Sequence, residues 1–460
     1  MTSYWFKKAY LIDQWQSNVT ITVSDSGDIS TVASDTNPDN ATVIDGFAMP
    51  GFPNIHSHAF QRVMAGLGEK ASSLDDNFWS WRNIMYQFAN MISPEDQQAI
   101  AAQLYMEMLK AGYTSVAEFH YLHNLTEGKP YANPIELSLA TISASKQTGI
   151  GLTHLPVLYM TSNFGGKPLK KEQMRFHNSL ESYQAMLQAI TDGAADNKPD
   201  KLGIALHSLR AVPEAAITET LAHINRLDNT APIHIHIAEQ TLEVDESIRW
   251  SGKRPVEWLL SNHDIDDRWC LIHATHLNDQ EVTAVARSGA AVGICPTTEA
   301  NLGDGIFPLA SYLQQGGKIA IGSDSNTSVS PIEELRWLEY GQRLKHHQRN
   351  IGATLQTPHT AENLVQKTLA GGAKALGRKV GKIDIGYSAD LLVLDEQSPH
   401  LYQKRSENIF DSLVFCGNTA MIRDVMCKGQ WCVKNYQHIN EAAITENYRA
   451  TIAHLQKNLH

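Results

Sequence analysis

Histidines and carboxylates recur at the ends of apolar runs along this chain, and two of the histidines lie only one residue apart. His56 and His58 follow an apolar run over 49–55, and residues i and i+2 of a strand face the same side. Both imidazoles can therefore point at one centre, as the ligands of a metal ion do. The pair alone is a weak indication, because many such pairs are ordinary surface or core histidines.

Later apolar runs end in further groups of the same chemical kind. We favour His236 over His234 as a ligand, because it lies nearer the end of its run and three residues before Glu239. His273 ends the next run, whereas His276 follows in the expected loop, and we assign the chemistry to His273. Three histidines and one carboxylate suit a borderline divalent ion with one position left for water. The groups supplied by 232–239, 270–276 and 318–325 are His234, His236, Glu239, His273, His276 and Asp324.

The apolar runs are short and alternate with helical stretches, one of which is framed by Ser93 and Pro94 at its start and Gly112 at its end. Serine followed by proline is typical of the first turn of a helix, and glycine commonly ends one. The alternation predicts an α/β protein with a (β/α)8 barrel, whose functional residues lie at the carboxyl ends of the strands. A doubly wound sheet is the rival architecture, but no G-x-G-x-x-G follows a strand. The predicted strands are 49–55, 114–121, 151–159, 203–210, 232–239, 270–276, 290–297 and 318–325.

Both ends of the chain have a different sequence pattern, in which short β-like segments are separated by Asp, Asn, Ser and Gly. We expect residues 1–48 and 376–437 to form one small β-sandwich domain built from both termini. The barrel is expected over 49–375. A packed helix is expected over 438–460, because apolar residues recur there at helical spacing.

Composition and charge exclude several classes of protein. The 460 residues are 42% apolar and 19% charged, which is typical of a soluble globular chain. A net charge of −11 argues against a nucleic-acid partner. The five cysteines form no C-x-x-C pair, and we expect reduced thiols in a cytoplasmic protein. Neither a signal peptide nor membrane association is expected, because no long uninterrupted apolar segment occurs.

The motifs together resemble the amidohydrolase superfamily over essentially the whole chain. HSH after the first strand, HIHIAE, LIHATH and GSDS carry the resemblance, with GKIDIGYSADLLVLD near the end. It implies a (β/α)8 barrel with a small β-sandwich from both termini, and metal binding by His56, His58, His236 and Asp324. Two-metal members usually place a bridging lysine at the end of the fourth strand, whereas GIALHSLR ends without one. One ion per chain is therefore expected, Zn2+ first and Fe2+ or Mn2+ as alternatives.

Longer runs resemble a narrower family, the formimidoylglutamate deiminases. These runs are HSHAFQRVMAGL, FWSWR, EFHYLH, HSLRAV and TEANLGDGIFP. The resemblance implies hydrolysis of N-formimino-L-glutamate, a small dicarboxylate, to N-formyl-L-glutamate and ammonia in histidine degradation. It also implies a homodimer. The implied catalytic residues are Glu239, His273 and Asp324, and the implied substrate-binding residues are Gln61, Arg82, Tyr121, His207 and Arg210.

Two arginines separate this reaction from its rivals. Guanidinium groups bind carboxylates through paired hydrogen bonds, and we expect Arg82 in a long loop after the first strand and Arg210 at the end of the fourth. A deaminase of a heterocycle, such as a guanine or adenosine-like ring, would share the metal site and Glu239 without needing two arginines. A non-catalytic metal-binding barrel would need neither Glu239 nor His273. Roles remain open for Glu299, Asn301, His276 and the cysteines.

Overall fold

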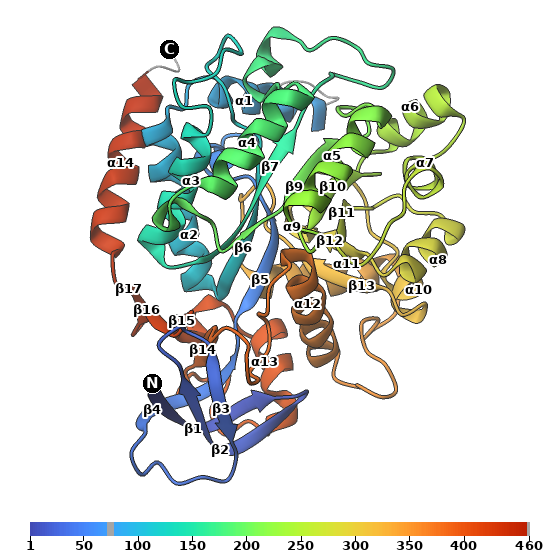
Figure 1. Ribbon diagram of the computed structural model, residues 1–460. Coiled ribbons are helices and arrows are strands. Elements are labelled where there is room, and N and C mark those ends of the chain that lie inside the picture. The colour runs from blue at the N-terminus through green and yellow to red at the C-terminus, as the bar shows by residue number, and fades with distance from the viewer. Residues whose placement is uncertain (71–77, 458–460) are drawn as a thin grey trace.

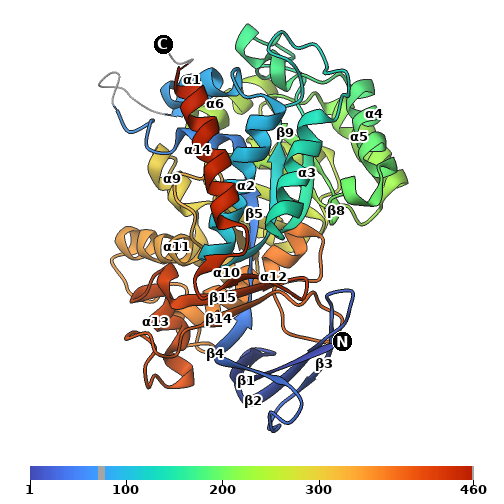
Figure 2. The same ribbon diagram turned by 90° about the vertical axis from the view of Figure 1, so that its left-hand side faces the viewer.

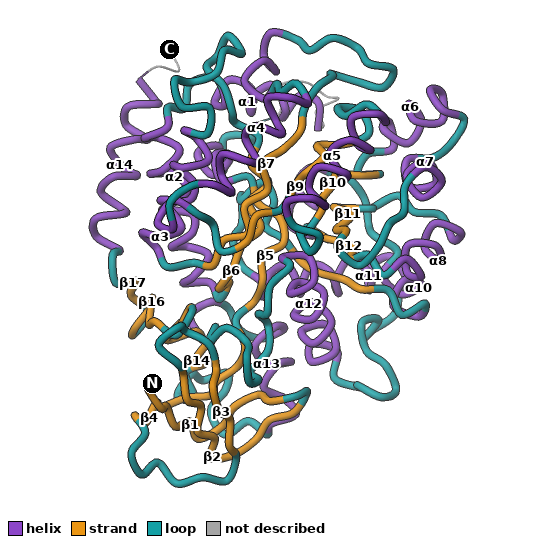
Figure 3. The backbone as a smooth tube through the Cα atoms, in the orientation of Figure 1, coloured by secondary structure: helices purple, strands orange, loops and turns teal. Residues whose placement is uncertain are grey.

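Parallel strands form a closed barrel in the upper part of the molecule, with helices around it (Figures 1 and 3). The structure is a computed structural model that describes residues 1–70 and 78–457. Each barrel strand overlaps one of the predicted runs, so the prediction of a (β/α)8 barrel is confirmed. A two-residue strand, β8 (Lys201–Leu202), also pairs with β7. The barrel strands are β5 (Phe52–Ser57), β6 (Tyr113–His120), β7 (Gly151–Leu158), β9 (Ile204–Ser208), β10 (Ile233–Ile237), β11 (Trp269–His273), β12 (Ala291–Ile294) and β13 (Lys318–Ile321).

The first and last barrel strands meet at a seam just beyond the end of β13. Ser57 and Asp324 form a parallel bridge there. The Asp324 amide donates to the His56 carbonyl at 2.9 Å, and the His58 amide donates to the Asp324 carbonyl at 3.1 Å. The barrel therefore closes through the backbone of three residues that the sequence assigns to the metal site.

Helices cover the outside of the barrel and connect its strands. In α2 (Pro94–Ala111), the Ser93 hydroxyl accepts from the Asp96 amide at 3.1 Å, and Gly112 ends the helix at φ +107°. Both ends agree with the sequence prediction. The other helices around the barrel are α1 (Phe78–Ala89), α3 (Glu136–Thr148), α4 (Leu180–Asp192), α5 (Glu214–Leu227), α6 (Thr241–Ser251), α7 (Pro255–Asn262), α8 (Asp279–Ser288), α9 (Pro296–Leu302), α10 (Leu309–Gln314), α11 (Pro331–His346) and α12 (Thr360–Leu376).

A second sheet at the lower end of the molecule combines both ends of the chain (Figures 1 and 2). Its strand β4 (Thr42–Pro50) pairs in parallel with β1 (Thr2–Leu11) and antiparallel with β14 (Leu391–Leu394). The prediction of a small β domain from both termini is thus confirmed, while its boundaries at 48 and 376 stay a prediction. Its hydrophobic core includes Phe6, Val19, Ile21, Leu391, Val393 and Met426. The remaining strands are β2 (Gln14–Val23), β3 (Ile29–Ala33), β15 (Ile422–Cys427), β16 (Gln430–Lys434) and β17 (Gln437–His438).

The C-terminal helix α14 (Glu441–Lys457) lies along the side of the barrel, beside α2 (Figure 2). Ile444 and Leu455 are buried, and Lys110 of α2 bonds Glu441 at 2.6 Å. The predicted helix extended to 460, and positions 458–460 lie outside the described residues. The short helix α13 (Ile409–Phe415) precedes β15. A search of the described helices finds none with the length and apolar content that a membrane span requires.

A group of buried histidines lies between the barrel wall and its helices. His120 and His154 come from β6 and β7, with ring centroids 5.2 Å apart, and the His120 ring is 3.5 Å from the Thr141 hydroxyl of α3. His154 is fully buried, and neither of its ring nitrogens has a hydrogen-bond partner in the described part of the chain. Burial lowers the pKa of His154 to about 3. The folded state therefore resists protonation here far more than the unfolded chain does.

We predict that His154 makes the fold sensitive to acid. The unfolded chain takes up a proton near pH 6.5, and the folded chain does so only near pH 3. Stability is therefore lost as the pH falls between these values, by about 1.4 kcal/mol per pH unit for one proton. Between pH 6.5 and 5, urea denaturation should show the wild-type protein losing about 2 kcal/mol more than His154→Leu. The exposed control His454→Leu should follow the wild type, and equal losses in all three proteins would contradict the prediction.

Candidate metal and catalytic site

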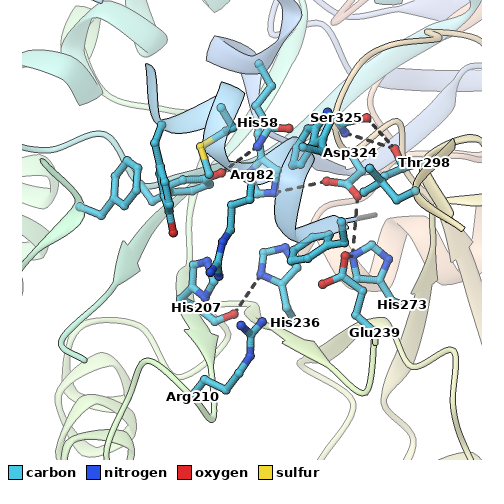
Figure 4. Close-up of a pocket in the computed structure, with 18 of the residues that line it drawn as sticks. His58, Arg82, His207, Arg210, His236, Glu239, His273, Thr298, Asp324 and Ser325 are labelled. Carbon is cyan, nitrogen blue, oxygen red and sulfur yellow. Dashed lines mark hydrogen bonds and ion pairs between the residues drawn. The ribbon is translucent and has the colours of Figure 1, made fainter. Parts of the chain in front are cut away.

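Four buried groups converge at the mouth of the barrel, and Figure 4 shows three of them, His58, His236 and Asp324. The Nε2 atom of His56 lies 3.1 Å from Nε2 of His58 and 2.9 Å from Nε2 of His236. Oδ1 of Asp324 lies 3.4 Å from Nε2 of His56 and 3.3 Å from Nε2 of His58. For metal–nitrogen bonds of about 2.1 Å, a tetrahedral ion sets its ligand atoms about 3.4 Å apart. The four groups thus have nearly the spacing of a coordination sphere.

Hydrogen bonds on the far side of two rings turn their lone pairs toward this centre. Nδ1 of His58 lies 3.0 Å from the Phe119 carbonyl, and Nδ1 of His236 lies 2.9 Å from the His207 carbonyl. A carbonyl only accepts, so each Nδ1 carries the hydrogen and each Nε2 presents a lone pair. Burial also lowers the pKa of all three cluster histidines, which keeps them neutral. The donor set therefore fits a divalent metal ion.

Left-handed backbone conformations at three strand ends aim the functional side chains. Ala238, His273 and Asp324 have φ values of +52°, +66° and +47°. Such a conformation costs an L-residue about 1–2 kcal/mol, so surrounding bonds must hold it. The Ala274 amide donates to the Ile237 carbonyl at 3.0 Å, and Asp324 is held by the seam. The side-chain alternation of a regular strand stops at these residues.

His273 and Glu239 lie next to the metal cluster. Nε2 of His273 is 3.7 Å from Oε1 of Glu239 and 3.7 Å from Oδ2 of Asp324. Burial raises the pKa of Glu239 to about 7. Burial opposes protonation of His273, but the nearby charge of Glu239 and the bond to Glu299 raise its pKa to about 10. Glu239 is thus suited to give and take a proton near neutral pH.

Two further carboxylates around His273 have no assigned role in the sequence analysis. Oε1 of Glu299 lies 3.2 Å from Nδ1 of His273. Asp304 forms a compact acidic group with Glu239 and His273, and the Gln240 amide donates to its carboxylate. Both carboxylates are buried. The sequence analysis left the role of Glu299 open and did not identify Asp304. Both residues follow the seventh strand in a segment without a recognisable spacing.

The predicted substrate residues line the same pocket as the metal and catalytic groups. Nε2 of Gln61 donates to the Tyr121 hydroxyl at 2.8 Å, and both side chains are buried. His207 packs against the Tyr159 ring at 4.4 Å between centroids. Arg82 lies in helix α1, so its expected placement in a loop was wrong. The aromatic pattern around it belongs to a helix that covers the pocket.

Arg82 and Arg210 bring two positive charges to one side of the pocket. Their guanidinium carbons lie 4.4 and 5.6 Å from the ring centre of Trp79. In residues 1–70 and 78–457, no carboxylate pairs with either arginine, and each has a buried Nε without a partner. Figure 4 shows both arginines on the His207 side of His236, opposite Glu239 and His273. The pocket is therefore cationic at one end and acidic at the other.

Other residues of the pocket wall were not assigned to the site in the sequence analysis. They are apolar, aromatic or hydroxyl side chains from helices and loops that are far apart along the chain. Their positions depend on how the helices cover the barrel, and this arrangement cannot be predicted from the spacing of residues along the sequence. The residues are Phe78, Trp81, Met85, Tyr86, Tyr159, Phe176, Thr298, Leu302 and Ser325.

Several conspicuous polar residues lie away from the pocket. The His234 ring bonds the Ala375 carbonyl at 2.7 Å, and the His276 ring bonds the Asp304 carbonyl at 2.9 Å. Asn301 donates to the Glu69 carboxylate at 2.7 Å. All five cysteines are free thiols. Structural hydrogen bonding thus accounts for these two histidines and the asparagine.

Comparison with known proteins places the chain among metal-dependent hydrolases. Residues 47–432 match the amidohydrolase family. A formimidoylglutamate deiminase of Pseudomonas aeruginosa is 47% identical over 441 residues, which cover 96% of each chain. A 5-methylthioadenosine/S-adenosylhomocysteine deaminase of Haloquadratum walsbyi is 26% identical and covers 93% of this chain and 89% of that one. The crystal structure of an amidohydrolase from Brucella melitensis has a TM-score of 0.93 at 39% identity, covering 99% of this chain and 100% of that one.

These similarities extend over the fold and the site together. The matched range begins in β4 and ends in β16, so it includes the whole barrel and the strands that join both chain ends. It also includes every residue of the metal cluster and of the pocket. On these grounds the chain belongs to the amidohydrolase family.

Proposed function

We propose that the protein is a formimidoylglutamate deiminase, which hydrolyses N-formimino-L-glutamate to N-formyl-L-glutamate and ammonia in histidine degradation. The observation that carries this proposal is the pair of arginines in the pocket of the metal cluster, neither of which has a carboxylate partner among residues 1–70 and 78–457. The relative from Pseudomonas aeruginosa, at 47% identity, supports the same reaction. The resemblance to that family also supports a homodimer in the cytoplasm.

We propose that His56, His58, His236 and Asp324 hold one divalent ion, with Zn2+ as the first choice and Fe2+ or Mn2+ as alternatives. Three imidazole nitrogens and a carboxylate oxygen are ligands that Zn2+ favours. When bound, such an ion lowers the pKa of water toward about 7 and so supplies hydroxide at neutral pH.

The surrounding side chains then move protons and hold the reacting group. Asp324 accepts a proton from the attacking water as the new C–O bond forms at the formimino carbon. Glu239 protonates the imine nitrogen and then the departing amine, because its raised pKa lets it hold a proton near neutral pH. His273 donates a hydrogen bond to the oxygen that becomes negatively charged. The intermediate's hydroxyl loses its proton as the formyl C=O bond forms, and the bond from carbon to the terminal nitrogen breaks. Both protons of water, one taken first by Asp324 and one lost from this hydroxyl, end on ammonia, so that Glu239 is protonated again for the next turnover.

The opposite end of the pocket holds the glutamate part of the substrate. Arg82 and Arg210 pair with its carboxylates, because a guanidinium donates two parallel hydrogen bonds to a carboxylate. Gln61, Tyr121 and His207 supply further polar contacts. The chain carries a net charge of −11, so a dianion needs this local positive field.

A heterocycle deaminase is the second candidate, and the relative from Haloquadratum walsbyi favours it at 26% identity. A neutral ring would offer no counter-charge to the buried Arg210 or to the partly buried Arg82, which is costly. A panel assay of N-formimino-L-glutamate, N-formimino-L-aspartate, guanine and S-adenosylhomocysteine separates the two functions.

We predict that the metal-loaded protein releases ammonia from N-formimino-L-glutamate and that Glu239→Gln does not. Glutamine cannot deliver the proton that the departing amine requires, and loss of a general acid typically costs about 100-fold to 10,000-fold in rate. A coupled ammonia assay measures both proteins. Absence of ammonia from every amidine and amide tested with the wild type would favour the non-catalytic metal-binding barrel.

We predict that Arg210→Met raises KM for N-formimino-L-glutamate about 100-fold, which corresponds to the loss of about 3 kcal/mol from a charged hydrogen-bonded contact. The metal content should stay at the wild-type value, because Arg210 is not a ligand. Steady-state kinetics and elemental analysis measure the two effects. Arg405→Met is the control, since its side chain is 84% exposed. An unchanged KM in Arg210→Met would contradict the assignment of a dicarboxylate.

We predict that protein purified without added metal holds about one divalent ion per chain and that His236→Ala holds far less. The matched control is His234→Ala, because both histidines are buried in β10 and only His236 reaches the cluster. Elemental analysis identifies and counts the ion, and circular dichroism checks that both variants fold. Equal metal loss in the two variants would contradict the choice of His236.

A further inference from the structure

The histidines of the site differ in what orients them. His58 and His236 donate from Nδ1 to backbone carbonyls. His273 instead has its Nδ1 3.2 Å from a side-chain carboxylate, that of Glu299. Either kind of acceptor can orient an imidazole, and a carboxylate in addition stabilises the ring when it carries a positive charge.

Glu299 is itself held firmly at the start of a helix. It lies in α9, and the Oε1 atom that faces His273 also accepts from the Cys295 amide at 2.9 Å. Its carbonyl accepts from the Asp304 amide at 2.9 Å. The side chain is only 5% exposed and does not line the pocket. Glu299 therefore cannot touch a bound substrate, and its contact with the site runs through His273.

His273 needs such a tether for two reasons. Its backbone and that of Ala274 are left-handed, at φ +66° and +46°, so the regular strand no longer sets the ring direction. Its Nε2 lies 3.7 Å from both Glu239 and Asp324. Both distances exceed a hydrogen bond. The short polar contact of the ring is therefore the one from Nδ1 to Glu299, and this contact makes the two ring nitrogens different.

We propose that Glu299 is a positioning residue for the deimination reaction. Its carboxylate accepts the Nδ1 hydrogen of His273 and fixes the ring so that Nε2 faces the reacting carbon between Glu239 and Asp324. This inference rests on the proposed function, since the reaction defines what His273 must face. It predicts an effect on turnover and little effect on substrate binding, because the arginine end of the pocket is untouched.

Glu299→Leu and Glu299→Gln test the proposal. Leucine has a similar size and no acceptor, and kcat should fall about 10-fold to 100-fold while KM and metal content stay near the wild type. Glutamine keeps an oxygen that can accept from Nδ1, so part of kcat should return. The matched control is Glu334→Gln, because Glu334 is also buried and accepts from the Thr297 amide of α9 at 2.9 Å without touching His273. Its kcat should stay near the wild-type value.

A double-mutant cycle shows whether Glu299 acts through His273. In a His273→Asn background, Glu299→Leu should change kcat less than about twofold, because coupled residues are not additive. Nitrogen-15 NMR of histidine-labelled protein gives a readout without catalysis. The His273 signal, identified by its loss in His273→Asn, should show both ring nitrogens protonated in the wild type, and in Glu299→Leu an Nδ1 that is no longer fully protonated.

Besides an unaffected Glu299→Leu variant, three outcomes would overturn the proposal. They are a raised KM with normal kcat in Glu299→Leu, an equal kcat loss in Glu334→Gln, and an undiminished effect in the His273→Asn background. Failure of the proposed function is a separate result, because wild-type protein would then release no ammonia from N-formimino-L-glutamate. An active wild type with an unaffected Glu299→Leu would remove only the role of Glu299.

Discussion

The seam of the barrel is the constraint on which the rest of the site depends. Two backbone hydrogen bonds join Asp324 to His56 and His58, and unpaired strand edges are costly when buried. The buried Asn326 side chain strengthens the seam by donating to the carbonyls of Asp324 and His58. The bonds that close the fold therefore also set the separation of three of the proposed metal ligands. A shift at the seam would open the barrel and misplace these groups together.

Charge is divided across the pocket that this seam creates. Glu239, Asp304 and Asp324 lie near His273, whereas Arg82 and Arg210 lie at the other end beside Trp79. Each group is costly to bury alone, and the two ends do not neutralise each other through direct ion pairs. A ligand with a basic amidine at one end and carboxylates at the other would compensate both. This complementarity connects the proposed chemistry to the shape and charge of the pocket.

The sequence predicted the barrel and the groups at its strand ends because these features depend on patterns among residues that are close together in the sequence. His56 and His58 share one side of a strand, and His236 and Asp324 follow from their places at later strand ends. Features that arise from packing were missed or misplaced. Arg82 was expected in a loop and lies in α1, and the closeness of Asp304 to Glu239 depends on how a long segment folds back over the barrel. The backbone of His273 is left-handed, so the side-chain alternation of a regular strand ends there. The direction of the His273 ring could therefore not be predicted from that alternation.

The pairing of β4 with β14 and of β5 with Asp324 also has a consequence for biosynthesis. Strands made early on the ribosome find their partners only when the last third of the chain has emerged. At translation rates of about 5–20 residues per second, this delay is on the order of tens of seconds. During that time, half of the metal ligands and two strand edges are exposed in the nascent polypeptide. The four proposed metal ligands can therefore come together only late in the synthesis of each molecule.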